Sequence, residues 1–133
     1  MYKKAVLMMA LGVVMAAVPV YGGDLPDDVK AGFEKAGMKI YPGAVYCTGQ
    51  LEWGIRFATS DSPEKVMQWY QKQYPQWSVQ DKFGLWTFYD GPPDQGPGFI
   101  MGVRNLFVKF TAELPGWHGL AANMTTEITM AAP

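Results

Sequence analysis

The sequence of 133 residues is poor in the side chains on which many protein sites depend. It contains one cysteine, so no disulfide can form within a single chain, and one histidine, so a histidine-rich metal site is excluded. It has no glycine-rich phosphate loop, no C-x-x-C pair and no H-E-x-x-H motif. Lysine and arginine form no basic cluster, and the formal net charge is −1. We therefore expect no metal, no cofactor and no nucleic-acid partner.

The first residues form the most distinctive segment of the sequence. Lys3 and Lys4 precede an uninterrupted apolar run from Ala5 to Val18, and small residues follow at Gly22 and Gly23. A basic start, an apolar centre and a small-residue exit are typical of a secretory signal peptide. The alternative is a retained membrane anchor, but a spanning helix needs about 20 apolar residues, which is more than this run supplies.

Apolar side chains are abundant in the chain as a whole: 49% of the residues are hydrophobic and 14% are aromatic. That share suits a packed domain and argues against intrinsic disorder, a collagen-like chain and a coiled coil. We predict a signal peptide over 1–22 and a single domain over 23–133. After cleavage the protein has no stable membrane span and is periplasmic or secreted.

Two segments have helical periodicity. In the first, over 24–36, Val29 and Phe33 fall on one face, and Gly37 supplies a stop. The second begins at a cap, for which both Asp61 and Ser62 are suitable. It continues through an apolar stripe to Tyr74 and ends because Pro75 disfavours helical angles in the preceding residue.

Most of the remaining chain alternates between apolar and polar residues with the period of a strand. This pattern predicts an antiparallel sheet with one face on a core and the other in water. The expected fold class is α+β, with an antiparallel sheet of about five to six strands and one or two helices on one face. The alternating segments are 53–57, 86–89, 106–113 and 124–130, and turn signals lie at 48–50, 83–84 and 114–116.

Two neighbouring segments interrupt this alternation. Six of the eight residues over 91–98 are glycine or proline, so we predict a loop through which no helix or strand runs. The segment 99–103 is ambiguous, because its apolar phase is opposite to that of the strand that follows. We expect a short strand here, joined to the next by a turn or bend.

Several motifs stand together in the first part of the expected domain: Tyr41-Pro42-Gly43-Ala44, Thr59-Ser60-Asp61-Ser62-Pro63-Glu64-Lys65-Val66, Trp69-Tyr70 and Trp77. This pattern resembles that of small secreted bacterial α+β domains of unknown function. The resemblance covers about residues 41 to 89 and consists mainly of a turn, a helix cap and a helix stripe. Gln76 departs from it, because a glycine is expected before the tryptophan. The resemblance implies an exported α+β domain and supplies no activity.

Few residues qualify for catalysis. His118 is the one side chain of a type that titrates near neutral pH unaided. A catalytic histidine needs a nucleophile and an orienting partner, and Cys47 and three serines are the candidate nucleophiles. We interpret His118 as an exposed loop residue and predict no catalytic residue. The alternative is a hydrolase or isomerase built from His118, a carboxylate such as Glu127, and Cys47 or a serine.

Cys47 has three interpretations in an exported protein. It is a buried small side chain, a reactive thiol, or one half of an intermolecular disulfide. Its period-two neighbour Val45 favours burial, and a dimer through Cys47 remains a second expectation. A reactive thiolate needs a cation or a helix start beside it, and the adjacent sequence offers neither.

The polar side of the predicted sheet is the first choice for a binding surface. Aromatic residues are dense between Trp69 and Tyr89, and Trp69, Trp77, Tyr89 and Trp117 are the least easily buried. We expect the ligand- or partner-binding residues to be Arg56, Tyr89, Lys109, Glu127, Trp117 and His118.

These observations favour a small exported non-enzymatic domain that binds an envelope protein or a small ligand. Besides the hydrolase or isomerase, one alternative remains open: an envelope assembly factor that acts through a sheet edge, for which the strand expected near Phe99 would serve.

Overall fold

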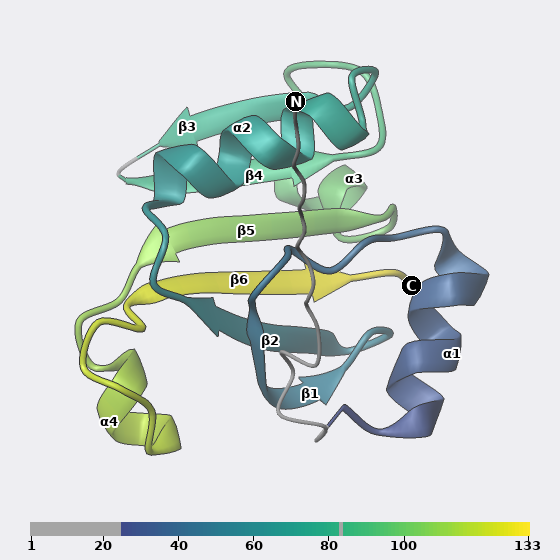
Figure 1. Cartoon of the computed structure of the whole chain (residues 1–133). Helices are drawn as coiled ribbons and strands as arrows, with labels where there is room; N and C mark the ends of the chain where they lie inside the picture. Colours follow the sequence, from purple (N-terminus) through teal and green to yellow (C-terminus); the bar gives the residue numbers. More distant parts are fainter. Residues whose placement is uncertain (1–24, 83) are drawn as a thin grey trace, which may run out of the picture.

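The computed structural model describes residues 25–82 and 84–133, so the predicted signal peptide over 1–22 lies outside the described residues. The described residues form four helices and six strands (Figure 1). In chain order they are α1 (Asp27–Ala36), β1 (Val45–Gln50), β2 (Gly54–Thr59), α2 (Pro63–Gln73), β3 (Ser78–Lys82), β4 (Leu85–Tyr89), α3 (Pro97–Ile100), β5 (Asn105–Phe110), α4 (Leu114–His118) and β6 (Thr126–Ala131).

The six strands form one sheet in the order β1-β2-β6-β5-β4-β3. Every neighbouring pair is antiparallel, including β2 with β6 and β5 with β6. Strand β6, the last in the chain, therefore lies in the middle of the sheet, between the β1–β2 hairpin on one side and β5, β4 and β3 on the other. The structure confirms the predicted α+β class with a six-stranded antiparallel sheet.

The ends of the two longer helices follow from local sequence. Gly37 ends α1 with φ +67°, a left-handed conformation that glycine adopts without a steric cost. The Ser62 hydroxyl accepts a hydrogen bond from the Lys65 N–H at 3.2 Å and caps α2, with Pro63 in its first turn. Asp61, the other cap candidate, accepts a hydrogen bond from the Tyr41 hydroxyl at 2.6 Å instead.

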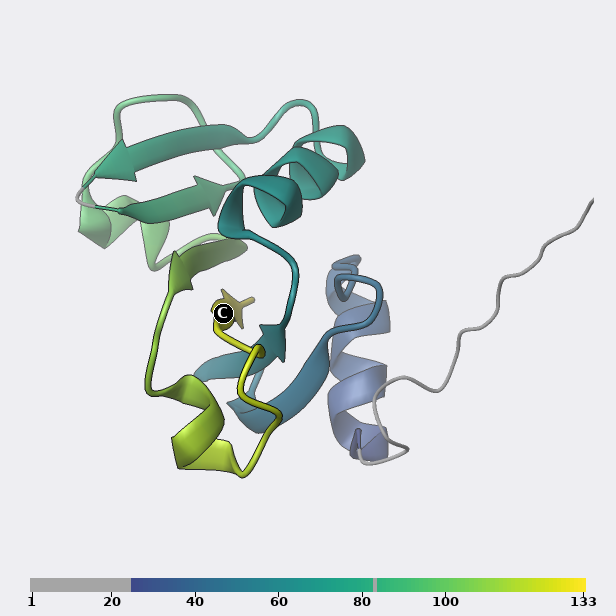
Figure 2. The same ribbon diagram turned by 60° about the vertical axis from the view of Figure 1, so that its left-hand side comes forward.

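The main core lies between one face of the sheet and helices α1 and α2. Figure 2 shows these two helices on one side of the sheet, and α3 and α4 on the other. Burying each large apolar side chain contributes about 1.5–3 kcal/mol, so this face provides most of the stability. The core contains Val29 and Phe33 of α1, Val66, Met67 and Tyr70 of α2, and Ile55, Phe57, Phe88, Leu106, Val108, Ile128 and Met130 of the sheet.

Trp69 and Trp77 contribute to the packing of this core. Both are partly buried and pack against it. The Trp77 ring stacks on Tyr74 with centroids 4.4 Å apart, and Trp69 meets Tyr41 edge-on at 5.5 Å. These ring contacts are of the kind that add about 0.5–1.5 kcal/mol beyond area burial, so packing accounts for this part of the aromatic cluster.

The structure corrects the expected strand over 99–103. Residues Pro97–Ile100 form the short helix α3, and β5 begins only at Asn105. Proline at the first helical position has a φ suited to a helix, and Ile100 is buried. Because β5 lies between β4 and β6, the strand that follows Phe99 is not an edge of the sheet. The prediction that nothing regular crosses 91–98 is also wrong at its last two residues.

Two predicted turns lie elsewhere. Residues 48–50 belong to β1, and the turn follows at 51–53. Residues 114–116 open helix α4, because Pro115 suits a first helical turn. Within residues 25–82 and 84–133 there is no helix of the length and apolar character that a membrane crossing requires.

Candidate binding site on the open sheet face

The face of the sheet that α1 and α2 leave uncovered carries a different set of side chains. Strand pairing places Arg56 opposite Thr129, and Thr129 opposite Phe107. In the neighbouring row, Glu127 lies opposite Lys109. We call the cluster of Arg56, Lys109, Glu127, Trp117 and His118 the open-face site. The structure thus brings together five of the six binding residues expected from the sequence.

Glu127 is the buried member of the open-face site. Only 6% of the residue is exposed, and a buried carboxylate is costly unless it is paired and hydrogen-bonded. The Thr111 hydroxyl donates to Oε1 at 2.9 Å, and the Thr129 hydroxyl donates to Oε2 at 3.1 Å. Arg56 Nε lies 3.3 Å from Oε2, close enough for an ion pair but without the alignment of a hydrogen bond.

Arg56 connects the sheet to helix α4. Its Nη1 lies 3.3 Å from His118 Nε2. Because a guanidinium only donates, we assign Nε2 as the acceptor and place the ring proton on Nδ1. The guanidinium carbon also lies 5.9 Å from the centre of the Trp117 ring, within the range of a cation–π contact. Arg56 is therefore held by Glu127 on one side and by two residues of α4 on the other.

Helix α4 is anchored by its first turn and leaves its last turn accessible. Leu114 and Pro115 are buried, whereas Trp117 is 60% exposed. Gly119, with φ +64°, ends the helix in a left-handed conformation directly after His118. The exposed indole and the half-exposed Arg56 guanidinium consequently form one surface.

Tyr89 lies apart from the open-face site. The expectation that it stays accessible is wrong, because its side chain is fully buried. Its hydroxyl donates to the Pro92 carbonyl at 2.8 Å and accepts from the Gln95 N–H at 3.2 Å. The glycine- and proline-rich loop folds over Tyr89 and uses it as an anchor. A loop without apolar periodicity gives no sign of this cover in the sequence.

Cys47 is a neighbour of the open-face site, near Arg56 and Glu127. The pairing of β1 with β2 shifts register between Tyr46 and Thr48, so Cys47 is the extra residue of a bulge. Burial raises the pKa of the thiol to about 11, while the charge of Arg56 lowers it and that of Glu127 raises it. The thiol therefore stays protonated near neutral pH and donates weakly to the Val45 carbonyl at 3.7 Å.

The arrangement suits recognition of an anionic group. The Arg56 guanidinium and the Lys109 ammonium supply two positive charges against the one negative charge of Glu127, and Trp117 supplies a flat apolar surface beside them. Within residues 25–82 and 84–133, no three His, Cys, Asp or Glu side chains gather into a group that could hold a metal.

Comparison of the chain with protein-family models, with curated proteins and with solved structures finds no match. The role of the open-face site is therefore inferred from its own residues and their contacts.

Proposed function

We propose that the protein is a small exported, non-enzymatic binding domain of the bacterial envelope that engages its ligand or partner through the open-face site. One observation carries this proposal. Glu127, buried and held by two threonine hydroxyls, fixes the Arg56 guanidinium beside the exposed Trp117. A guanidinium fixed before binding loses little conformational entropy when the complex forms.

The chemistry of the site indicates the class of group that it recognises. Arginine and tryptophan are the side chains most often responsible for binding energy at interfaces, and a guanidinium pairs well with carboxylate or phosphate. The adjacent Lys109 adds positive charge. A carboxylate or other anionic group next to an apolar surface is the ligand feature that matches this set.

The contacts of His118 and Cys47 favour binding over catalysis. His118 Nε2 already accepts from Arg56, so this nitrogen is occupied by a cation where a general base would need it free. The raised pKa of Cys47 keeps its thiol protonated, whereas a nucleophilic cysteine requires a lowered one. The assembly-factor alternative has no support from the segment near Phe99, since that segment is helical.

A paired tryptophan experiment tests the proposal. The purified protein is screened for heat stabilisation against anionic small molecules and used to capture binding proteins from an envelope extract. A ligand at about 100 times its Kd adds about 2.7 kcal/mol of apparent stability. We expect Trp117→Ala to abolish the effect and Trp53→Ala to preserve it, because Trp53 is 84% exposed in the β1–β2 turn. Equal behaviour of the two variants would refute the assignment of the site.

A further inference from the structure

A concave surface lies along helix α1, away from the open-face site. The cavity has a volume of about 560 Å³ and lies between α1, the β1–β2 turn and residues 132–133 after β6. Helices α1 and α4 stand at opposite ends of the strands in Figure 1. We call this cavity the α1 groove. Its lining includes Asp28, Val29, Gly32, Lys35, Leu51, Glu52 and Arg104.

Gly32 keeps the α1 groove open at the middle of the helix. A glycine inside a helix costs about 1 kcal/mol relative to alanine, and such a cost is often explained by a close approach or a positive φ. Neither applies here, because a Cβ on Gly32 would meet nothing nearer than Leu51 Cδ2 at 4.0 Å. The space that a side chain would fill is the groove itself.

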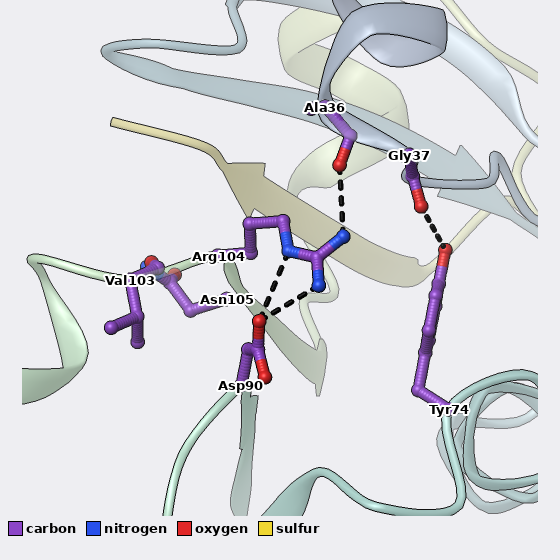
Figure 3. Close-up of polar contacts among 7 residues, drawn as sticks. All are labelled: Ala36, Gly37, Tyr74, Asp90, Val103, Arg104 and Asn105. Atoms are coloured by element: carbon purple, nitrogen blue, oxygen red, sulfur yellow. Dashed lines mark hydrogen bonds and ion pairs between the residues drawn. The ribbon is translucent and has the colours of Figure 1, made fainter.

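The groove carries opposite charges at the two ends of α1. Asp28 lies in the first turn and Lys35 in the last, so their Cα atoms are about 10 Å apart along the axis. The Arg104 guanidinium lies at the same end of α1 as Lys35, because its Nη1 donates to the Ala36 carbonyl at 2.9 Å (Figure 3). Glu52 adds a second carboxylate from the β1–β2 turn. These full charges outweigh the half charges of the helix dipole, which have the opposite sense.

Arg104 is fixed in position before any ligand arrives. Figure 3 shows its guanidinium between Asp90 and the end of α1. Nη2 and Nε donate to Asp90 Oδ2 at 2.7 and 3.2 Å, and the group lies 5.2 Å from the centre of the Trp77 ring. Asp90 therefore fixes Arg104 and balances its charge, and Lys35 supplies the remaining positive charge at this end of the groove.

We propose that the α1 groove binds a short peptide of about three residues with both ends free. An extended chain of three residues spans about 10 Å, which matches the separation of the charged ends. The peptide ammonium pairs with Asp28, and the carboxylate pairs with Lys35 beside the Arg104 guanidinium. Between them, the apolar side chains of Val29 and Leu51 face the peptide.

Titration of the full protein with trialanine, followed by NMR, tests this assignment. We expect trialanine to bind with a Kd of no more than about 10 mM. Acetylating the amino terminus or amidating the carboxylate removes one ion pair each and weakens binding about fivefold. Failure of trialanine to bind, or equal binding of the blocked peptides, overturns the proposal. Tight binding of the acetylated peptide alone would indicate a protein C-terminus instead.

Two matched pairs of variants locate the site. Gly32→Leu fills the groove and should abolish binding, while Ala31→Leu on the exposed face of α1 should leave it unchanged. Lys35→Glu should weaken binding at least fivefold, and Lys30→Glu, with the same change of charge outside the groove, should not. Trp117→Ala should have no effect, which separates this site from the open-face site. Binding that survives both Gly32→Leu and Lys35→Glu contradicts the assignment.

Discussion

The two faces of the sheet are built from alternate residues of the same strands, yet they are organised by different forces. Ile55 and Phe57 of β2 are fully buried against the helices, whereas Arg56 between them points to the opposite face and pairs with Glu127. The covered face depends on apolar area removed from water. The open face depends on a charge that is buried and then satisfied by hydroxyls and a guanidinium. Stability is thus concentrated on one face, and a prearranged recognition surface on the other.

The largest expected effect comes from the covered face. Phe57 is completely buried and its ring meets Phe33 and Tyr46 edge-on at 5.8 and 6.0 Å. Phe57→Ala should lower the free energy of unfolding by about 3–5 kcal/mol, as measured by urea denaturation. Phe107→Ala on the open face should cost much less, because Phe107 is only half-buried. Equal losses would mean that the two faces contribute alike to stability.

The next effect concerns the charge network. Glu127→Gln leaves the Arg56 guanidinium without its counter-charge, and we expect a loss of about 1–3 kcal/mol. If the Arg56–Glu127 pair positions the guanidinium more than it stabilises the fold, the double variant Arg56→Met with Glu127→Leu should lose less free energy of unfolding than the two single variants together. A double-mutant cycle measures this coupling. Additive losses would show that the two side chains do not act together.

The alternation along the strands made the separation of the two faces predictable. The period of two predicts Arg56 and Glu127 on the polar face, and the structure places both on the face opposite the buried Ile55 and Phe57. The pattern did not predict how deeply each side chain is buried. The Glu127 carboxylate is buried against Thr111 and Arg56, and these contacts link residues distant in sequence.

The errors have a common physical cause, which is that short segments follow their surroundings more than their own pattern. The apolar residues of 99–103 suited a strand, but Pro97 starts a helix and Ile100 anchors it. Tyr89 was expected in water because it alternates with a core residue, and the loop that covers it has no periodicity. A bulge at Cys47 shifts one strand by one residue, and no composition rule announces such a shift.

A smaller effect should be visible in the chemistry of Cys47. With the pKa of Cys47 raised to about 11 by burial, its rate of alkylation by iodoacetamide should keep rising with pH up to about 11 and level off there. In urea, where the chain is unfolded, the rate should level off near the ordinary thiol pKa of about 8.5. The folded state keeps a proton that the unfolded chain loses, so stability should fall as the pH rises from about 9 towards 11. Cys47→Ala should flatten this decline; a profile identical in folded and unfolded protein would contradict the assigned burial.

The smallest effect on stability is expected from substitutions of two glycines in and after helix α1, at the margin of the covered face. Gly32 lies inside α1 and Gly37 directly follows it, and of the two only Gly37 has a positive φ. Gly32→Ala adds a Cβ into open space 4.0 Å from Leu51 and should raise the free energy of unfolding by about 0.5–1 kcal/mol.

Gly37→Ala must force a left-handed conformation and also approaches Arg104 Nη1 to 3.3 Å, so it should destabilise by about 1 kcal/mol. If thermal or urea unfolding shows that Gly32→Ala stabilises the protein and Gly37→Ala destabilises it, then Gly37 is needed for the fold and Gly32 is not. A loss of stability at both positions would mean that packing at Gly32 is tighter than its surroundings indicate, and the open floor of the α1 groove would no longer explain the glycine.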